Sequence, residues 1–164
     1  MKRIYIIGGT MGVGKTTVCQ KLKKLLPDSV FLDGDWCWDM SPFNVTEETK
    51  AMVMDNICYI LNNYIHCSAF NNIIFCWVMH EQRIIDDIVS ALDTRKCEVK
   101  LISLICGEQQ LRKRLQKDVD ARIRESDILE RSIARLPLYE SLDTIKIDVS
   151  NISAEQTAKI ISEL

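Results

Sequence analysis

Two kinds of segment alternate along the whole chain and differ in the spacing of their apolar residues. Short continuous runs of Val, Ile and Leu predict strands that are buried on both faces of a sheet. Apolar residues at helical spacing, such as Val53, Ile57, Leu61 and Tyr64, predict helices between the strands. The expected strands span residues 3–7, 30–32, 73–78, 99–105 and 144–147. The expected helices span residues 15–26, 47–65, 82–92, 109–117, 127–136 and 154–164.

This alternation predicts one α/β domain over residues 1–164, with a five-stranded parallel sheet between two layers of helices. Right-handed crossovers bring the carboxyl ends of all strands to one edge, where ligands bind. Local signals mark several helix ends. Thr46 is an expected N-cap, and Ser153 with Gln156 forms a capping-box pattern. The prolines stand near expected element ends, and Pro137 directly follows one expected helix.

The loop after the first expected strand carries the most specific pattern of the chain, G-x-x-x-x-G-K-T. It stands between a strand and a helix, which is the setting in which this P-loop (Walker A) pattern binds phosphate. Its glycines let successive backbone N–H groups face one phosphate, and the helix N-terminus adds partial positive charge. Lys15 would reach the outer phosphates, and Thr16 would offer a hydroxyl to Mg²⁺. The residues expected to bind the nucleotide here are Gly9, Thr10, Met11, Gly12, Val13, Gly14, Lys15, Thr16 and Thr17.

The loop therefore predicts a three-layer α/β/α P-loop NTPase fold, which GTPases, large ATPases and small-molecule kinases share. A GTPase normally carries N-K-x-D to read guanine, and this chain has none. A large ATPase usually has an aspartate after a strand, whereas Met79, His80 and Glu81 follow the strand expected at 73–78. The short length favours a small-molecule kinase that uses ATP and Mg²⁺, with the preference between ATP and GTP left open.

The segment Asp33-Gly34-Asp35 directly follows the second expected strand. A kinase needs one carboxylate near the acceptor hydroxyl and an anion near magnesium, usually through water. The segment resembles the D-G-D or D-x-D of small P-loop kinases that act on shikimate, gluconate or adenylyl sulfate. That resemblance implies that Asp35 binds the acceptor and takes its proton, while Asp33 holds Mg²⁺. The reverse assignment, or a solvated Asp-Gly turn, remains open.

A second segment resembles the lid closure of adenylate kinases, R-x-x-D followed by R-L-x-x-Y. The matching residues are Arg124, Asp127, Arg135, Leu136 and Tyr139. The resemblance implies a short helical lid at about 107–137, in which Arg124 and Arg135 clamp the transferring phosphoryl group. Guanidinium groups suit the negative charge that spreads over this group in the transition state. A solvated helix face with i,i+4 ion pairs is the alternative interpretation.

Two further residues are expected on the nucleotide. Arg114 resembles the arginine that stacks on adenine in these kinases, although a surface basic cluster explains it equally well. Asn151 lies in the loop after the last expected strand, where related kinases hold the base through backbone groups. Asp118 replaces another family arginine, and the third strand lacks the D-G-x-P-R pattern of true adenylate kinases. The resemblance is therefore to the wider P-loop small-molecule kinase group, including nucleotide-kinase-like and chloramphenicol-phosphotransferase-like proteins.

Aromatic residues gather in the segments that should surround the acceptor. Trp36 and Trp38 follow Asp35, and Trp77 lies at the end of the third expected strand. Aromatic rings suit stacking on a planar ring or a sugar face, and Glu81 would bind an acceptor hydroxyl or magnesium. Core packing is the alternative for the tryptophans, above all for Trp77.

Composition narrows the partners and the setting. The formal net charge of −2 argues against a nucleic-acid binder, which needs a basic face. No apolar run is long enough to span a membrane, and the N-terminal segment lacks a signal-peptide cleavage site. The seven cysteines form no C-x-x-C pair, which favours reduced, mostly buried thiols in the cytoplasm and no zinc site. The oligomeric state stays open between a monomer and a homodimer.

Together these features predict a phosphotransferase that moves the γ-phosphoryl group of ATP to a small-molecule hydroxyl. The acceptor classes left open are nucleosides or nucleotides, sugars and antibiotics. The alternative is an ATP-binding regulatory or switch protein with slow or no hydrolysis. A kinase that acts on a nucleic-acid end is disfavoured by the acidic net charge.

Overall fold

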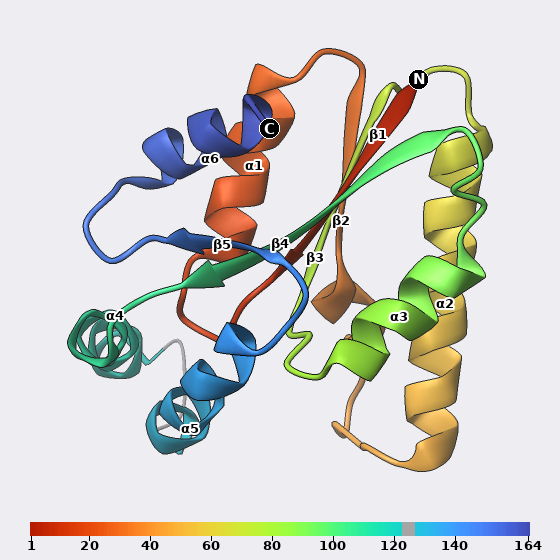
Figure 1. Cartoon of the computed structure of the whole chain (residues 1–164). Coiled ribbons are helices and arrows are strands. Elements are labelled where there is room, and N and C mark those ends of the chain that lie inside the picture. Colours follow the sequence, from red (N-terminus) through yellow and green to blue (C-terminus); the bar gives the residue numbers. More distant parts are fainter. Residues whose placement is uncertain (123–126) are drawn as a thin grey trace.

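A five-stranded parallel sheet forms the centre of the computed structural model, which describes residues 1–122 and 127–164 (Figure 1). The strands lie in the order β2-β3-β1-β4-β5, so β1 occupies the middle, and each pairs in parallel with its neighbours. The strands are β1 (Lys2–Gly8), β2 (Ser29–Asp33), β3 (Asn72–Trp77), β4 (Cys97–Ile105) and β5 (Ile145–Asp148). All five overlap the segments expected from the apolar runs, which confirms the predicted parallel sheet.

Helices cover both faces of the sheet and the edge where its strands end (Figure 1). The helices are α1 (Lys15–Leu25), α2 (Glu47–His66), α3 (Gln82–Ala91), α4 (Glu108–Asp120), α5 (Ile128–Glu140) and α6 (Ala154–Ser162). In the view of Figure 1, α1 and α6 lie on one face, α2 and α3 lie on the other, and α4 and α5 lie near the carboxyl ends of β1 and β4. The three-layer α/β/α fold is therefore confirmed.

The central strand shows why its sequence is a continuous apolar run. Ile4 and Ile6 are buried in the core beneath α2 and α3, whereas Tyr5 and Ile7 are buried in the core beneath α1 and α6. Successive side chains of a strand point to opposite faces, so a strand covered on both sides needs apolar residues at every position. The sheet is thereby packed between two apolar cores. The loops that follow its strands are not needed for this packing and can form a site.

The helix ends follow the sequence with one exception. The Thr46 cap of α2 and the capping box of Ser153 with Gln156 at α6 are both present. The expected helix end before Pro137 is wrong, because α5 continues through this proline to Glu140. A proline lacks the N–H that an inner helical turn requires, so a stop was expected there. The fully buried Tyr139 lies beyond Pro137, and its packing in the core favours the continued helix.

Two observations bear on the setting of the chain. Within residues 1–122 and 127–164, no helix combines the length and the apolar character that crossing a membrane requires. The seven cysteines are free thiols, and Cys19, Cys58, Cys76 and Cys106 are buried.

Candidate functional site

The loop between β1 and α1 is shaped by its glycines and packs closely against α4. Gly12 has a φ of +82°, and a Cβ atom there would lie only 2.5 Å from Cδ2 of Leu115 on α4. Gly14, with a φ of +103°, is the N-cap of α1, and no side chain within the described residues caps this helix. The first N–H groups of α1 thus remain for a ligand, as at other helix N-termini that bind phosphate.

Lys15 and Thr16 place a cation and a hydroxyl at this loop. The Nζ atom of Lys15 donates hydrogen bonds to the carbonyl oxygens of Gly9, at 2.8 Å, and Thr10, at 3.1 Å. Burial lowers the pKa of the Lys15 ammonium from its ordinary value, although nearby thiol and carboxylate groups partly oppose this shift. The Thr16 hydroxyl donates to Oδ2 of Asp33 at 2.7 Å. A partly desolvated cation and an oxygen pair therefore lie beside the helix N-terminus.

The two aspartates after β2 have different surroundings. Asp33 is buried, and its Oδ1 accepts a hydrogen bond from the backbone N–H of Asp35 at 3.1 Å, which caps the short 3-10 helix η1 (Gly34–Trp38). Sequence reasoning missed this 3-10 turn. A Cβ atom on Gly34 would lie 2.6 Å from Cγ of Trp77, so only glycine fits between the two aspartates. Asp33 is thus held against the loop, while Asp35 begins a turn that borders open space.

Three adjoining cavities surround the loop. The Arg114 cavity, of about 170 Å³, is lined by Val13, Gly14, Thr17, Val18, Arg114, Val149, Ile152, Ala154 and Thr157. The P-loop cavity, of about 180 Å³, is lined by Met11, Gly12, Gly14, Lys15, Thr16, Thr17, Asp35 and Asp118. The tryptophan cavity, of about 590 Å³, is lined by Met11, Asp35, Trp38, Phe43, Val45, Lys50, Trp77, Val78, His80, Ile84, Arg131 and Arg135. Gly14 and Thr17 line the first two cavities, and Met11 and Asp35 line the last two. The P-loop cavity therefore adjoins each of the other two.

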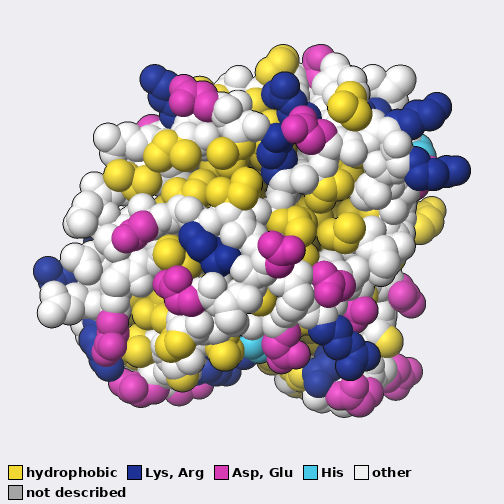
Figure 2. Space-filling view, viewed as in Figure 1, with side chains coloured by type: hydrophobic (Ala, Val, Ile, Leu, Met, Phe, Trp, Pro, Cys, Tyr) yellow, Lys and Arg dark blue, Asp and Glu magenta, His cyan; other side chains and the backbone are white. Residues whose placement is uncertain are grey.

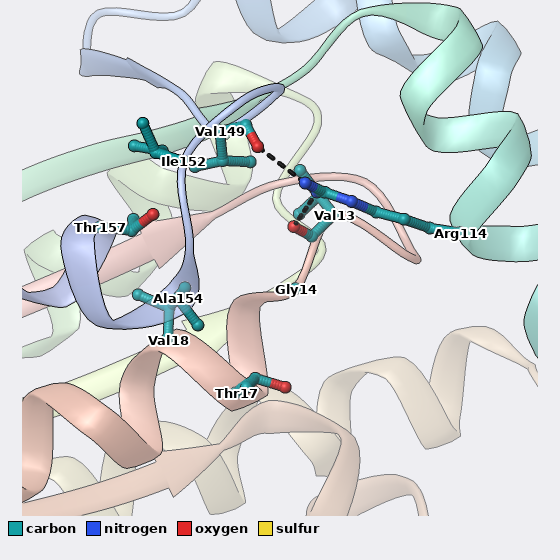
Figure 3. Close-up of a pocket in the computed structure, with 9 residues that line it drawn as sticks. All are labelled: Val13, Gly14, Thr17, Val18, Arg114, Val149, Ile152, Ala154 and Thr157. Atoms are coloured by element: carbon teal, nitrogen blue, oxygen red, sulfur yellow. Dashed lines mark hydrogen bonds between the residues drawn. The ribbon is translucent and has the colours of Figure 1, made fainter.

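Arg114 joins three segments at one end of this series (Figure 3). It extends from α4, and its guanidinium donates to the carbonyl oxygen of Val13 at 3.0 Å and to that of Val149 at 2.7 Å. The loop after β5 thus lies beside the P-loop, as a base-binding loop would. The side chain of Asn151 is exposed and does not line the cavity, whereas its neighbour Ile152 does.

The tryptophan cavity gathers some of the expected acceptor residues and leaves others out. Trp38 and Trp77 line it, together with Phe43, whose ring centroid lies 5.8 Å from that of Trp38. Trp36 does not line it; its ring packs edge-on against Phe31 and is largely exposed. Glu81 is the N-cap of α3 and also lies outside the lining. The cavity is thus bounded by aromatic side chains from η1, from the loop before α2 and from β3.

A family model described as an AAA domain matches residues 6–133 of the chain. The chain belongs to this AAA domain family. None of the curated proteins compared with it matches its sequence. Three solved structures with low sequence identity share the fold of this AAA domain. A tunicamycin resistance protein of Deinococcus radiodurans has a TM-score of 0.68 and 16% identity, with 99% of this chain and 94% of that chain covered. A sugar kinase of Janibacter sp. has a TM-score of 0.72 and 16% identity, with 99% and 94% covered. A fungal RNA kinase has a TM-score of 0.61 and 17% identity, with 99% and 84% covered.

These matches confirm the expected P-loop fold of the small-molecule kinase group. The fungal RNA kinase also shows that one fold serves acceptors of very different size. The fold alone therefore does not identify what this AAA domain binds in its cavities.

Helix α5 connects the loop of the AAA domain to the tryptophan cavity. The hydroxyl of Thr10 donates to the carbonyl oxygen of Ser132 at 2.8 Å, and both residues are buried. One turn further along α5, Arg135 lines the tryptophan cavity. Arg124, the other arginine expected in the clamp, lies outside the described residues.

Sequence reasoning did not single out several residues that the fold brings to the tryptophan cavity. Val45 precedes α2, Lys50 lies in the first turns of α2, and Ile84 lies on α3. No motif marks them, because each comes from a different element and contributes one side chain. The position after a strand end, which identified Asp35, gave no signal for residues on helices.

Proposed function

We propose that this protein is an ATP- and Mg²⁺-dependent phosphotransferase that moves the γ-phosphoryl group of ATP to a small-molecule hydroxyl. The observation that carries the proposal is the series of three cavities, with the P-loop cavity between the other two. Phosphoryl transfer needs a donor and an acceptor on opposite sides of one phosphorus atom. A nucleoside in the Arg114 cavity and an acceptor in the tryptophan cavity would meet this requirement.

The donor side fits a nucleotide and its magnesium ion. The backbone N–H groups of the loop and Lys15 would hold the phosphates. The Thr16 hydroxyl and the Asp33 carboxylate, 2.7 Å apart, are oxygen ligands of the kind that Mg²⁺ prefers, directly or through water. When bound, Mg²⁺ would offset negative charge on the phosphate oxygens. Arg114 would border the base and fix the loop after β5.

The acceptor side fits an in-line attack by a hydroxyl group. Asp35 lines both the P-loop cavity and the tryptophan cavity, so it borders the place where the phosphoryl group would pass. The acceptor oxygen forms a bond to the γ-phosphorus atom while the bond to the bridging oxygen of ADP breaks. The hydroxyl proton passes to the Asp35 carboxylate and then to solvent. Arg135, and Arg124 by its resemblance, would stabilise the charge of the transferring group.

The second candidate is an ATP-binding switch with slow or no hydrolysis. Strand β3 ends at Trp77, and the residues after it include no aspartate, which ATP-hydrolysing modules usually carry there. A nucleic-acid acceptor has less support. On the face shown in Figure 2, basic and acidic side chains are interspersed, and the net charge is −2. Free thiols suit a reducing compartment such as the cytoplasm.

Release of ADP in the presence of Mg-ATP tests the proposal. The acceptors should be a panel of nucleosides, nucleotides, sugars and antibiotics, each compared with a blank that contains no acceptor. A phosphotransferase releases ADP with one acceptor class and forms a phosphate ester of that acceptor. Tight ATP binding without ADP release across the panel would favour the switch, and absence of ATP binding would contradict both.

A further inference from the structure

The tryptophan cavity is lined by aromatic and aliphatic side chains together with ionisable ones. Its volume of about 590 Å³ is in the range of small-molecule pockets. Its apolar lining residues include Met11, Trp38, Phe43, Val45, Trp77 and Ile84. A polyhydroxyl compound loses water at each hydroxyl when it binds and needs a polar partner in return. Seven of the twelve lining residues are apolar, and this part of the wall favours an apolar molecular body.

The aromatic walls have both fixed and open parts. Trp77 is held by its close contact with the backbone at Gly34. Phe43 contacts Trp38, with an interplanar angle of 53°, yet its side chain is 68% exposed. Exposed aromatic surface that borders a cavity is stabilised when a ligand covers it. A flat ring system covers such surface with little loss of hydrogen bonding.

The charged groups of the cavity limit the charge of the ligand. Lys50, Arg131 and Arg135 are cations, whereas Asp35 is the only carboxylate among the described residues that line it. Acidic residues outside the lining pair with two of these cations: Glu47 with Lys50, at 2.9 Å, and Asp127 with Arg131, at 3.8 Å. With these pairs counted, Asp35, Glu47 and Asp127 balance the three cations, so the cavity offers no net attraction to a cationic acceptor.

His80 adds a polar group to the cavity lining but does not add a second carboxylate. Burial lowers its pKa, and the nearby Arg135 lowers it further, so the imidazole is neutral near pH 7. Its Nε2 atom lies 3.4 Å from the Glu81 carboxylate, while its buried Nδ1 has no hydrogen-bond partner within the described residues. A neutral imidazole against aromatic walls is compatible with an uncharged ring.

We propose that the acceptor is a flat, largely apolar hydroxyl compound without positive charge. Its ring covers Trp38 and Phe43, and its hydroxyl group lies at Asp35. This inference rests on the proposed function for the identity of the transferred group, but the preference of the cavity can be measured without any turnover. It separates this protein from kinases whose acceptors are open-chain sugars or cationic aminocyclitols.

Saturation-transfer NMR with Mg-ADP present tests the preference by binding alone. The flat probes are uridine, 4-hydroxybenzyl alcohol and 4-hydroxybenzoate. The polar probes are ribose, gluconate and 2-deoxystreptamine; ribose is the matched control for uridine, because it has the sugar without the flat base. We expect the tightest flat probe to bind at least about tenfold more strongly than the tightest polar probe. Equal binding, or stronger binding of a polar probe, would overturn the inference.

Substitutions at two exposed aromatic residues test whether the flat probes bind at the tryptophan cavity. Phe43→Ser should weaken binding of the flat probes by about tenfold and leave ribose unchanged. Tyr59→Ser is the matched control, because Tyr59 is 71% exposed on α2 and does not line the cavity. Equal effects of the two variants would contradict the assignment.

The two proposals fail in different ways. Flat probes that bind through Phe43, without phosphoryl transfer to any acceptor, would leave the cavity preference intact and contradict the kinase. ADP release with ribose or gluconate alone would confirm the kinase and overturn the acceptor class.

Discussion

The Arg114 and P-loop cavities differ from the tryptophan cavity in what they are made of. The first two combine side chains with backbone groups: the glycine turns, the N-terminus of α1 and the carbonyl oxygens that Arg114 joins. The tryptophan cavity consists of side chains that come from η1, α2, β3, α3, α5 and the loops beside them. Backbone contacts recognise a phosphate whatever the side chains are, whereas a side-chain cavity changes its ligand with each substitution.

This difference explains why a shared fold implies a phosphate site but does not identify the second ligand. The sugar kinase, the tunicamycin resistance protein and the RNA kinase share the backbone arrangement at identities of 16–17%. At such low sequence identity the fold is kept, but the side chains around an acceptor are not. Substitutions in the two kinds of cavity should therefore have different effects.

The largest effect is expected for Lys15→Ala on the backbone side. Removal of this cation should lower phosphoryl transfer by about 10²–10³-fold or more, because no other described side chain at the loop replaces it. Thermal stability should change little, since the hydrogen bonds of Lys15 within residues 1–122 and 127–164 go to carbonyl oxygens of its own loop. Lys24→Ala, on the exposed side of the same helix, is the control. Equal ADP release by wild type and Lys15→Ala would remove Lys15 from the mechanism.

The contrast also explains how much the sequence alone could predict. The P-loop was recognised because its residues are contiguous and its chemistry is backbone chemistry. The five strands were found because burial on both faces leaves continuous apolar runs. By contrast, η1 depends on a single cap by Asp33, and continuation of α5 past Pro137 depends on the packing of Tyr139. Lys50 and Ile84 reach the tryptophan cavity only through tertiary folding, so no local sequence pattern identified them as lining residues.

The next largest effect is expected for substitutions of Asp35 and Asp33, which should differ because the two carboxylates have different proposed roles. Asp35→Asn should lower kcat by about 10²–10³-fold with little change in ATP affinity, because it removes the proposed proton acceptor. Asp33→Asn should instead weaken Mg-ATP binding, since Asp33 accepts from Thr16 at 2.7 Å. Steady-state kinetics with titrated Mg²⁺ would measure both. The opposite pattern would exchange the two roles.

Gly34→Ala tests the boundary between the two kinds of cavity. The new Cβ atom would lie 2.6 Å from Cγ of Trp77, which must shift to make room. We expect a loss of about 1–3 kcal/mol in the free energy of unfolding and weaker binding of flat acceptors. Urea unfolding and the NMR probes would measure these changes. A variant with native stability and native probe binding would show that Trp77 moves freely.

Thr10→Val tests the connection between the loop and α5. It removes the hydrogen bond to the carbonyl oxygen of Ser132 and keeps the shape of the side chain. The expected loss is about 1 kcal/mol of stability, with faster hydrogen exchange in α5 and a higher KM for the acceptor. Thr10→Ser keeps the hydroxyl and should behave as wild type. Unchanged exchange in α5 would mean that the bond does not position this helix.

The smallest effect is expected on the pH dependence of stability, through His80. In the unfolded chain its pKa is ordinary, whereas burial and Arg135 lower it in the folded protein. The unfolded state therefore binds more protons below the ordinary pKa of about 6.5, and stability falls as the pH decreases through that value. His80→Gln should remove this part of the pH dependence and leave the acidic limb due to carboxylates. Urea unfolding at about pH 7.5 and about pH 5.5 measures the difference. An identical decrease in wild type and variant would show that the aromatic cavity accepts a charged imidazole, which would also weaken the case for an uncharged ligand there.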